Sequence, residues 1–541
     1  MNLMHDVRAT ASWPNPYRKR AGRRLANGGH IYDWKTTCGH RCFSLLMATS
    51  GMFDRAMAKD KGPRISGRRR ELRTLAGLLE SSRPEFLALY GRRRVGKTFL
   101  VRQFFSDRAR MFEVTGRHNG TMADNLRVFA EALSDSFHGG AGAAVPATWH
   151  DAFRALRREL ERRRRSRKKV VLFFDELPWL ATHKSGCLEE LEHFWNSWCS
   201  KQPTIVLIVC GSAASWMLKH VVHAHGGLHN RLTETIRLLP FSLAEAHTLL
   251  ADRGIRITRH QAVELYMALG GVPHYLEKVP RGASMAQAID ALCFAPAGPL
   301  AHEFDHLFAS LFAADDIYLR IVRELAKGRY GLSRQDLLRK VGIASGGGAN
   351  RILSNLEEAG FIQTTIPFGR TSRDRFYRLV DEFSLFHQSW LAGRNRRKGG
   401  DWLATRGSPR WTAWSGLAFE SLCLKHVDAI ERALGISGVR TEASSWQHRA
   451  RTRSARGAQI DLLIDRADDL ISVCELKHTV NPFAITKRYA QALRNKLAVF
   501  QQQTGTRKGL QLVLIATAGL VDNAYARDVV DHRVDLDAFW S

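Results

Sequence analysis

Apolar positions along this chain follow different spacings in different segments. Between residues 65 and 241, apolar runs of strand length alternate with stretches in which apolar residues recur at helical spacing. This alternation is typical of an α/β fold in which helices cover both faces of a parallel sheet. The predicted strands are residues 86–90, 111–114, 170–174, 204–210 and 235–241.

The pattern after residue 241 divides the next part of the chain. It is helical through about residue 299, which predicts a helical lid at 242–300 after an α/β core at 63–241. Residues 315–380 then show three helical stretches separated by turns and followed by a hairpin pattern. This order is typical of a winged helix-turn-helix, which we assign to residues 301–390.

The remaining segments differ in periodicity. Residues 1–62 mix Pro, Gly, Arg and aromatic residues and are predicted to be a basic, poorly ordered extension. The Gly- and Arg-rich residues 391–410 are predicted to be a basic linker. Residues 411–541 begin with a helical pattern and predict a second, smaller α/β domain. Its predicted strands are residues 460–464, 470–476 and 512–516.

The amino-acid composition indicates what kind of partner the protein binds. The chain has 541 residues, of which 45% are hydrophobic and 25% charged, so it is a folded protein with several domains. Its formal net charge of +29 predicts a polyanionic partner, with nucleic acid, above all DNA, first and an anionic membrane surface second. No run approaches the roughly 18 apolar residues of a membrane span, so we expect a cytoplasmic protein without a membrane partner. The basic segments are residues 1–70, 151–169, 391–411 and 440–456.

A glycine-rich motif follows the first predicted strand directly. It fits the P-loop pattern, in which backbone N–H groups and a helix N-terminus surround the phosphates of a nucleotide. Lys97 would reach the β- and γ-phosphates, and the Thr98 hydroxyl would bind Mg²⁺. The sequence therefore predicts ATP and Mg²⁺ as cofactors. The predicted nucleotide-binding segment is Gly91, Arg92, Arg93, Arg94, Val95, Gly96, Lys97, Thr98 and Phe99.

An acidic pair ends the strand at residues 170–174. Asp175 would hold Mg²⁺ through water, and Glu176 would polarise the water that attacks the γ-phosphate. A strand-end acidic pair can also be merely solvated. The P-loop in the same chain favours the catalytic interpretation.

Residues 65–300 resemble the archaeal-type ATPase family of AAA+/STAND P-loop proteins. The resemblance implies that Ser212 is a polar sensor of the γ-phosphate and that Arg231 is an arginine finger acting in trans within a homo-oligomer. It also implies that the turn at Pro273 lets the lid sense nucleotide. The structural alternatives are a strand cap, a surface salt bridge and a plain interhelical turn. The resemblance rests on Ile65, Ser66, Gly67 and Arg68, on Leu89, Tyr90 and the P-loop, and on Gly271, Val272 and Pro273.

The predicted winged helix has a weak nucleic-acid signature. DNA-reading helices usually carry several polar or basic side chains. Only four such side chains stand on the third helix, so DNA contact and a structural or protein-binding role both stay open. They are Asn350, Arg351, Ser354 and Asn355.

The last domain contains a second set of charged residues. Glu475 and Lys477 share one face of a predicted strand, and pairing with the neighbouring strand can bring Asp461 beside them. Two carboxylates and a lysine can hold Mg²⁺ and assist hydrolysis of a phosphodiester. This pattern resembles the PD-(D/E)xK nuclease core, and Glu420 matches the additional acidic residue on its first helix. The whole segment resembles a domain of unknown function that is commonly fused to archaeal-type ATPases.

Two functional hypotheses follow. In the first, ATP binding and hydrolysis control DNA binding or metal-dependent DNA cleavage by a restriction-endonuclease-like domain. In the second, the protein is a nucleotide-gated regulator or scaffold whose nuclease-like domain is catalytically inactive.

Overall fold

The computed structural model describes residues 65–163, 168–223, 228–312, 316–328, 331–393, 401–448 and 457–541. These residues all fall within one compact unit, Arg64–Ser541. The predicted extension at residues 1–62 and residues 449–456 of the basic segment at 440–456 lie outside the described residues.

A parallel five-stranded sheet forms the first part, as predicted. Its strand order is β2-β3-β4-β1-β5, and every strand is parallel to its neighbours. The apolar runs of the three central strands β1, β3 and β4 are buried along almost their whole length, which explains why these strands were readable from the sequence. The strands are β1 (Glu85–Tyr90), β2 (Arg110–Thr115), β3 (Val170–Asp175), β4 (Ile205–Gly211) and β5 (Glu234–Arg237).

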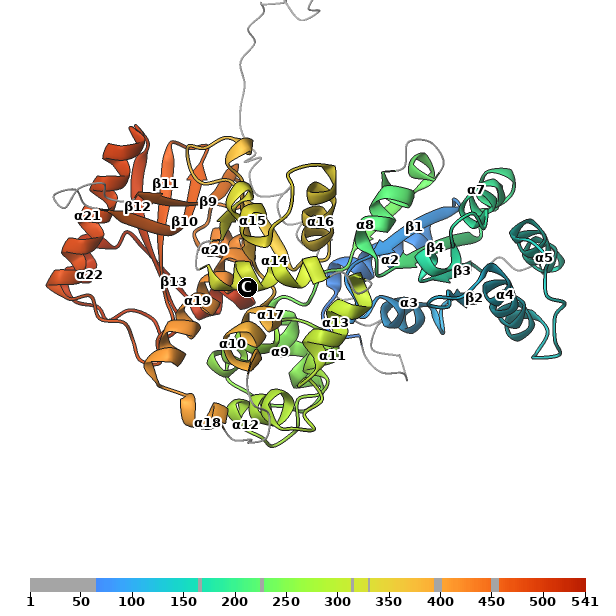
Figure 1. Ribbon diagram of the computed structural model, residues 1–541, viewed down its shortest axis with the longest axis horizontal. Helices are drawn as coiled ribbons and strands as arrows, with labels where there is room; N and C mark the ends of the chain where they lie inside the picture. The colour runs from blue at the N-terminus through green and yellow to red at the C-terminus, as the bar shows by residue number, and fades with distance from the viewer. Residues whose placement is uncertain are drawn as a thin grey trace, which may run out of the picture. The chain divides into compact units, whose positions relative to one another are not determined.

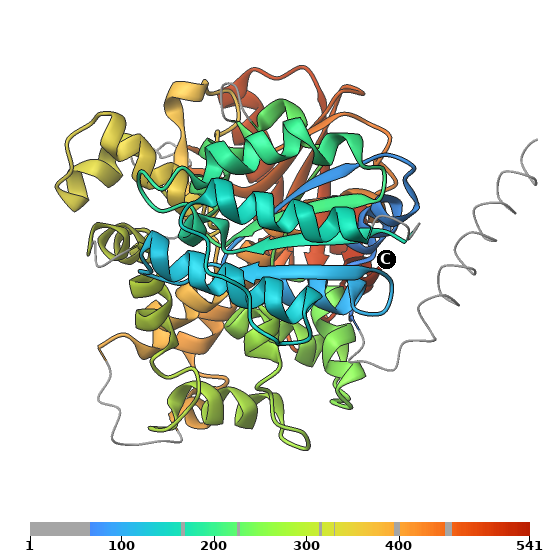
Figure 2. The ribbon, with the colours of Figure 1, turned by 90° about the vertical axis from the view of Figure 1, so that its right-hand side faces the viewer.

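Helices pack along this sheet (Figures 1 and 2). Aromatic side chains of α4, α5 and α7 join those of the strands in one core, with Phe112, Phe129, Trp149 and Phe153 in mutual ring contact. Thr121 and Thr148 cap α4 and α5. The helices are α2 (Arg69–Glu80), α3 (Lys97–Phe105), α4 (Met122–Phe137), α5 (Trp149–Arg162), α6 (Leu177–Leu180), α7 (Cys187–Ser197) and α8 (Ala214–Met217).

The strand β5 ends earlier than predicted. It stops at Arg237, and the backbone N–H of Phe241 instead donates to the carbonyl of Gly271. That bond joins the sheet to a helical segment, where the sequence predicted a lid. Its helices are α9 (Leu243–Asp252), α10 (Arg259–Leu269), α11 (Pro273–Leu276), α12 (Met285–Ile289) and α13 (Glu303–Phe312).

Residues 316–391 contain the predicted order of three helices and a hairpin. A three-stranded sheet, β6-β8-β7, accompanies them, and its assignment as a winged helix stays a prediction. A short helix and a π-helical turn follow. The elements are α14 (Asp316–Lys327), β6 (Leu332–Ser333), α15 (Arg334–Val341), α16 (Gly347–Glu358), β7 (Ile362–Thr365), β8 (Phe376–Leu379), α17 (Glu382–Phe386) and the π-turn η6 (His387–Leu391).

A mixed sheet of order β13-β12-β11-β10-β9 forms the last part (Figure 1). Its two faces have different cores: Leu462 and Cys474 pack toward α19, whereas Leu463 and Val473 pack toward α21. The elements are α18 (Asp401–Thr405), α19 (Pro409–Lys425), α20 (Val427–Ala433), β9 (Thr441–His448), β10 (Ala458–Arg466), β11 (Leu470–Lys477), α21 (Lys487–Thr504), β12 (Gly509–Ala516), α22 (Ala524–Val529) and β13 (His532–Asp535).

Residues 394–400 of the segment predicted as a basic linker lie outside the described residues, whereas residues 401–410 are described. Helix α18 lies within it, and Trp402 is buried at 3% exposure against Phe294, Phe386, Trp390 and Trp414. Trp402 could have indicated a packed helix in this Gly- and Arg-rich segment, because burial of one large ring outweighs the local preference for a loop.

One apolar core runs through three of the predicted domains. It extends from Phe241 to Phe539 and includes residues of α10, α14, α17, α19 and β11. A change in one of these elements therefore cannot occur without repacking its neighbours. None of the described helices is long and apolar enough to cross a bilayer.

Candidate functional site

The carboxyl ends of three adjacent strands place the predicted nucleotide residues together. Strand β4 lies between β1 and β3, so Ser212 follows β4 between the P-loop after β1 and Asp175 at the end of β3. Ligands of open parallel sheets bind at this edge. Thr98 contacts Asp175 directly although the two residues are 77 positions apart in the chain. Glu176 contacts Ser212, which lies 36 positions further along.

The P-loop backbone depends on two glycines. Gly91 has φ +154°, and a Cβ there would lie 2.2 Å from the Leu238 carbonyl oxygen. Gly96 has φ +88° and precedes α3, whose N-terminus faces the loop. Lys97 is buried, and its Nζ donates to the carbonyl oxygens of Gly91 and Arg92 at 2.9 and 3.0 Å. The lysine is therefore held inside the loop that would surround the phosphates.

A hydroxyl and a carboxylate meet at the predicted Mg²⁺ position. The Thr98 hydroxyl donates to Asp175 Oδ2 at 2.7 Å, and Asp175 is 3% exposed. Mg²⁺ prefers such hard oxygen ligands, so these two residues fit the ion that the P-loop motif implies.

Glu176 is held by the end of β4. Its Oε2 accepts from the backbone N–H of Ser212 at 3.0 Å and from the Ser212 hydroxyl at 2.9 Å. The residue has φ +46°, a left-handed conformation that costs free energy outside glycine. Its packing environment thus fixes the carboxylate at the strand edge, beside the residue predicted to sense the γ-phosphate.

The side chains of the three P-loop arginines contact other protein side chains. Arg92 is 2% exposed, forms an ion pair with buried Asp381, and lies over the ring of Phe361 at 4.7 Å. Burial opposes ionisation of both partners, yet their mutual attraction prevails: the pKa of Arg92 lies above, and that of Asp381 below, its usual value. The sequence placed Arg92 at the nucleotide, whereas its side chain contacts the segment that precedes α17.

The neighbouring arginines behave similarly. Arg94 pairs with Glu303, which also accepts a 2.8 Å hydrogen bond from the Tyr275 hydroxyl. Arg93 lies over the ring of Trp179 at 5.0 Å. Sequence reasoning missed Asp381 and Glu303, because their separation from the P-loop leaves no local signal.

The remaining predicted residues have mixed positions. Val95 is buried, and its carbonyl accepts a 3.1 Å hydrogen bond from buried Arg68. Phe99 is 44% exposed on α3. Arg231 is exposed in the turn His229–Arg231 before β5, and Pro273 begins α11. Their predicted roles stay predictions.

The glycine turn before α11 has a steric requirement. A Cβ on Gly271 would lie 1.9 Å from the Phe241 carbonyl oxygen. The close approach joins the helical segment to the chain leaving β5.

A second polar site lies in the C-terminal sheet. Glu420 of α19, Asp461 of β10, and Glu475 and Lys477 of β11 line one cavity of about 590 Å³. Helix α21 closes it with Lys496, a residue that the sequence reasoning did not identify. The four predicted residues are therefore brought together.

One carboxylate in this cavity, Glu475, is already paired with cations. Glu475 is buried and forms ion pairs with Lys477 at 2.7 Å and Lys496 at 2.5 Å, and Tyr489 donates to the same carboxylate. Burial alone would raise the pKa of Glu475, but the two lysines lower it to about 2. Tyr489 and Lys496 lie seven residues apart on one face of α21, a spacing that could have indicated a shared role.

The carboxylates of this cavity are suitable ligands for a divalent cation, but their positions do not form a metal site. Carboxylates suit Mg²⁺. However, in the part of the chain that the structure describes, no three histidine, cysteine, aspartate or glutamate side chains are grouped to hold a metal ion. Asp461 instead accepts a hydrogen bond from the Gln459 amide at 2.5 Å.

Two residues of the third helix in the predicted winged helix have internal partners. Asn350 accepts from Arg334 at 2.9 Å, and Asn355 donates to the Tyr318 hydroxyl at 2.7 Å. Arg351 and Ser354 are exposed. Half of the predicted DNA-facing set is thus engaged within the domain.

Comparison with known proteins bears on the first site. Residues 66–279 match the family described as an ATPase domain predominantly from Archaea. An uncharacterized protein of Methanocaldococcus jannaschii is 22% identical over 403 residues, covering 73% of this chain and 83% of that protein. The family match confirms the predicted archaeal-type ATPase domain.

Comparison with solved structures gives matches at low identity. A Walker-type ATPase of Pyrococcus abyssi is 19% identical, with a TM-score of 0.44 over 60% of this chain and 96% of that chain. The ORC2 protein of Aeropyrum pernix, in ADPNP–ADP complexes, is 15% identical, with a TM-score of 0.37 over 60% of this chain and 93% of that chain.

Proposed function

We propose that the protein is an ATP-hydrolysing switch whose nucleotide state controls a DNA-binding C-terminal half. The main observation for this proposal is a pair of hydrogen bonds at the edge of the sheet, from Thr98 to Asp175 and from Ser212 to Glu176. Mg²⁺ bound by Thr98 and Asp175 would neutralise phosphate charge. Glu176 orients the attacking water, Lys97 holds the β- and γ-phosphates, and Ser212 reports the γ-phosphate to Glu176.

The route from nucleotide to the rest of the chain runs through the P-loop arginines. Arg92 and Arg94 are anchored on Asp381 and Glu303, so movement of the loop displaces α13 and the segment leading into α17. Glu382, the first residue of α17, pairs with Lys425 of α19 at 2.7 Å. Because these elements share one core, the displacement reaches the C-terminal sheet.

Substitution of the P-loop lysine tests the ATPase. Lys97→Ala should lower kcat/KM for ATP by about 100-fold or more, because it removes a charge-assisted contact to the phosphates. Lys201→Ala, on the exposed turn Cys199–Lys201, is the matched control and should retain turnover. Unchanged hydrolysis in Lys97→Ala would show that the site is elsewhere.

A second candidate function is metal-dependent phosphodiester hydrolysis by the C-terminal domain. It is favoured by one observation, the convergence of Glu420, Asp461, Glu475 and Lys477 on one cavity. A bound Mg²⁺ would supply a Lewis acid, and the carboxylates would hold it once the lysines moved from Glu475. The other arrangement, an inactive domain that only grips DNA or a protein, keeps those lysines in place.

Plasmid cleavage distinguishes the two arrangements. With Mg²⁺ or Mn²⁺ and ATP, an active domain should nick plasmid DNA, and Asp461→Asn should abolish nicking. Asp468→Asn, in the exposed turn after β10, is the matched control. Salt-sensitive DNA binding without nicking in the wild type would support the inactive domain. Nicking that survives Asp461→Asn would exclude this cavity.

An arginine finger at Arg231 is a further part of the proposal. Its exposed position before β5 permits contact with a second copy, where it would stabilise the charge that develops in the transition state. Mixing Arg231→Ala subunits with Lys97→Ala subunits should restore turnover if the finger acts in trans.

A further inference from the structure

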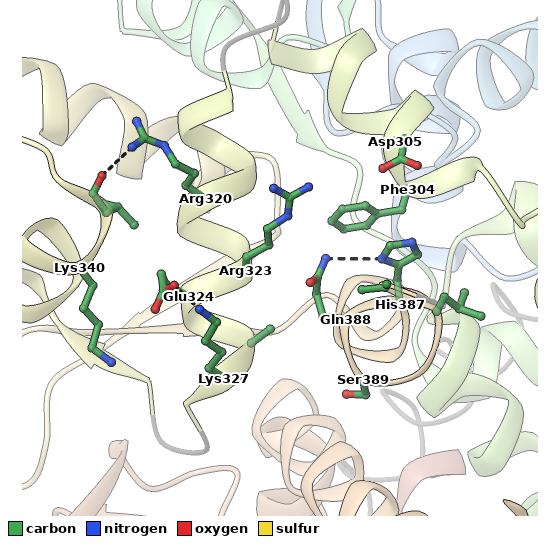
Figure 3. Close-up of a pocket in the computed structure, with 15 residues that line it drawn as sticks. Phe304, Asp305, Arg320, Arg323, Glu324, Lys327, Lys340, His387, Gln388 and Ser389 are labelled. Carbon is green, nitrogen blue, oxygen red and sulfur yellow. Dashed lines mark hydrogen bonds and ion pairs between the residues drawn. The ribbon is translucent and has the colours of Figure 1, made fainter. Parts of the chain in front are cut away.

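A cavity of about 810 Å³ lies away from both sites described above. It is bounded by α13, α14, the C-terminal end of α15 and the π-turn η6 (Figure 3). Its size falls within the range of small-molecule sites, roughly 300–1,000 Å³. It shares no lining residue with the cavity in the C-terminal sheet.

Basic side chains dominate one wall. Arg320, Arg323 and Lys327 share one face of α14, and Lys340 comes from α15. Arg320 donates to the Val341 carbonyl at 3.0 Å, and Lys327 pairs with Glu324. Arg323 and Lys340 make no hydrogen bond or ion pair with any other residue that the structure describes. Two cations are therefore available to a ligand.

The opposite wall offers flat and polar groups. His387 stacks on Phe304 with ring centroids 4.2 Å apart and an interplanar angle of 7°. Gln388 and Ser389 also line the cavity, and Figure 3 shows Arg323 between α14 and the aromatic pair. Guanidinium and ammonium groups opposite amide and hydroxyl groups suit a compact anion with several acceptor oxygens.

Two acidic residues limit the kind of anion. Asp305 and Glu324 line the same cavity. A nucleic-acid backbone lying across the opening would meet these carboxylates, whereas a small ligand can contact the cations alone. We propose that this cavity binds a small phosphorylated molecule and that its occupancy alters ATP turnover.

The two walls of the cavity belong to the elements that the P-loop arginines contact, which would couple ligand binding to ATP turnover. Phe304 follows Glu303, the partner of Arg94. His387 is the first residue of the π-turn η6, which continues directly from α17, the helix that begins after Asp381, the partner of Arg92. The stacked pair thus joins the two elements on which the P-loop arginines are anchored. A ligand that fixes the pair constrains both anchors. This part of the proposal rests on the proposed ATPase function, whereas ligand binding does not.

Binding is tested with inorganic tripolyphosphate at fixed free Mg²⁺, by calorimetry on the Lys97→Ala protein, in which phosphate binding at the P-loop is weakened. Arg323→Ala/Lys340→Ala should weaken binding at least about tenfold, because two charged contacts are lost. Arg158→Ala/Arg339→Ala removes two exposed cations that do not line the cavity and should bind as before. Absence of binding, or binding unaffected by the first pair, overturns the site.

Two further arms identify the ligand source and the coupling. If a short DNA duplex binds through Arg323 and Lys340 while tripolyphosphate does not, the surface is a nucleic-acid contact and the proposal fails. In wild-type protein, competition at the P-loop raises the KM for ATP, so kcat at saturating ATP isolates the second site. Tripolyphosphate should change kcat at least about twofold in wild type and leave it unchanged in Arg323→Ala/Lys340→Ala. Equal kcat responses in both proteins overturn the coupling.

Discussion

The two polar sites of this protein use carboxylates in opposite ways. At the nucleotide site, Asp175 and Glu176 accept hydrogen bonds from neutral groups, the Thr98 hydroxyl and Ser212, which leave their negative charge available to Mg²⁺ and water. In the C-terminal cavity, two lysines neutralise Glu475. Bringing carboxylates together is therefore not sufficient for a metal site, because the charge of their neighbours decides what they can bind.

The largest expected effect concerns the anchor of the nucleotide site. Arg92→Ala or Asp381→Ala should each lower the free energy of unfolding by about 3–5 kcal/mol, because each leaves an unpaired buried charge. The double variant Arg92→Met/Asp381→Leu should recover much of the loss. Urea unfolding monitored by fluorescence measures this, with exposed Arg73→Ala as the control. Additive losses in the double variant would mean that the pair is not coupled.

The next effect separates binding from catalysis at the same site. Glu176→Gln should lower kcat for ATP hydrolysis by about 100-fold while ATP affinity changes little, because the amide cannot polarise water as a carboxylate does. Single-turnover kinetics and equilibrium ATP binding measure the two quantities. Glu189→Gln, on the exposed start of α7, should behave as wild type. An equal loss of affinity would assign Glu176 a structural role instead.

Acid should weaken the C-terminal half. The Nε2 atom of half-buried His426 accepts from the Leu243 N–H at 3.1 Å, and the removal of this ring from water lowers the pKa of His426 to about 4. Since the unfolded histidine titrates near 6.5, the unfolded chain binds more protons between these values. This contribution to stability is present above pH 6.5 and is lost as pH falls toward 4, by up to about 3 kcal/mol.

A substitution isolates that histidine. His426→Gln should make the fall in melting temperature between pH 7 and pH 4.5 shallower, and His478, whose pKa burial also lowers to about 4, accounts for part of the remainder. Exposed His183→Gln is the control. An unaltered pH profile in His426→Gln would contradict the assignment.

The smallest expected effect tests the paired charges in the C-terminal cavity. Lys496→Met removes one of the two cations on Glu475, so the pKa of Glu475 should rise toward its ordinary value. Without nucleotide, Mn²⁺ binding followed by calorimetry should tighten by about three- to tenfold because a repelling charge is gone. Lys487→Met, on the first turn of α21, should have no effect. Unchanged Mn²⁺ affinity in Lys496→Met would show that Lys496 is not what prevents metal binding in this cavity.

Local sequence was a good guide where function depends on neighbours along the chain. The parallel sheet, Lys97 at the start of α3 and the acidic end of β3 were predictable, because the buried strands β1, β3 and β4 read as continuous apolar runs and phosphate binding requires glycines next to a helix. The convergence of Asp461, Glu475 and Lys477 was predicted from strand alternation and pairing, whereas Glu420 was expected there only from the resemblance to the nuclease core. The sequence pattern did not predict the helix at Trp402, because the burial of one large ring outweighs the loop preference of the surrounding Gly and Arg residues.

Only the tertiary structure decided what the charged residues contact. The motif predicts that the Arg92 backbone lies at the nucleotide, but it gives no partner for the Arg92 side chain, which pairs with a carboxylate 289 residues away. Lys496 and Tyr489 turn a predicted metal ligand into a neutralised one. The physical reason is common to both: strand and helix periods are set by local backbone geometry, whereas an ion pair is set by which long side chains packing brings within a few ångströms.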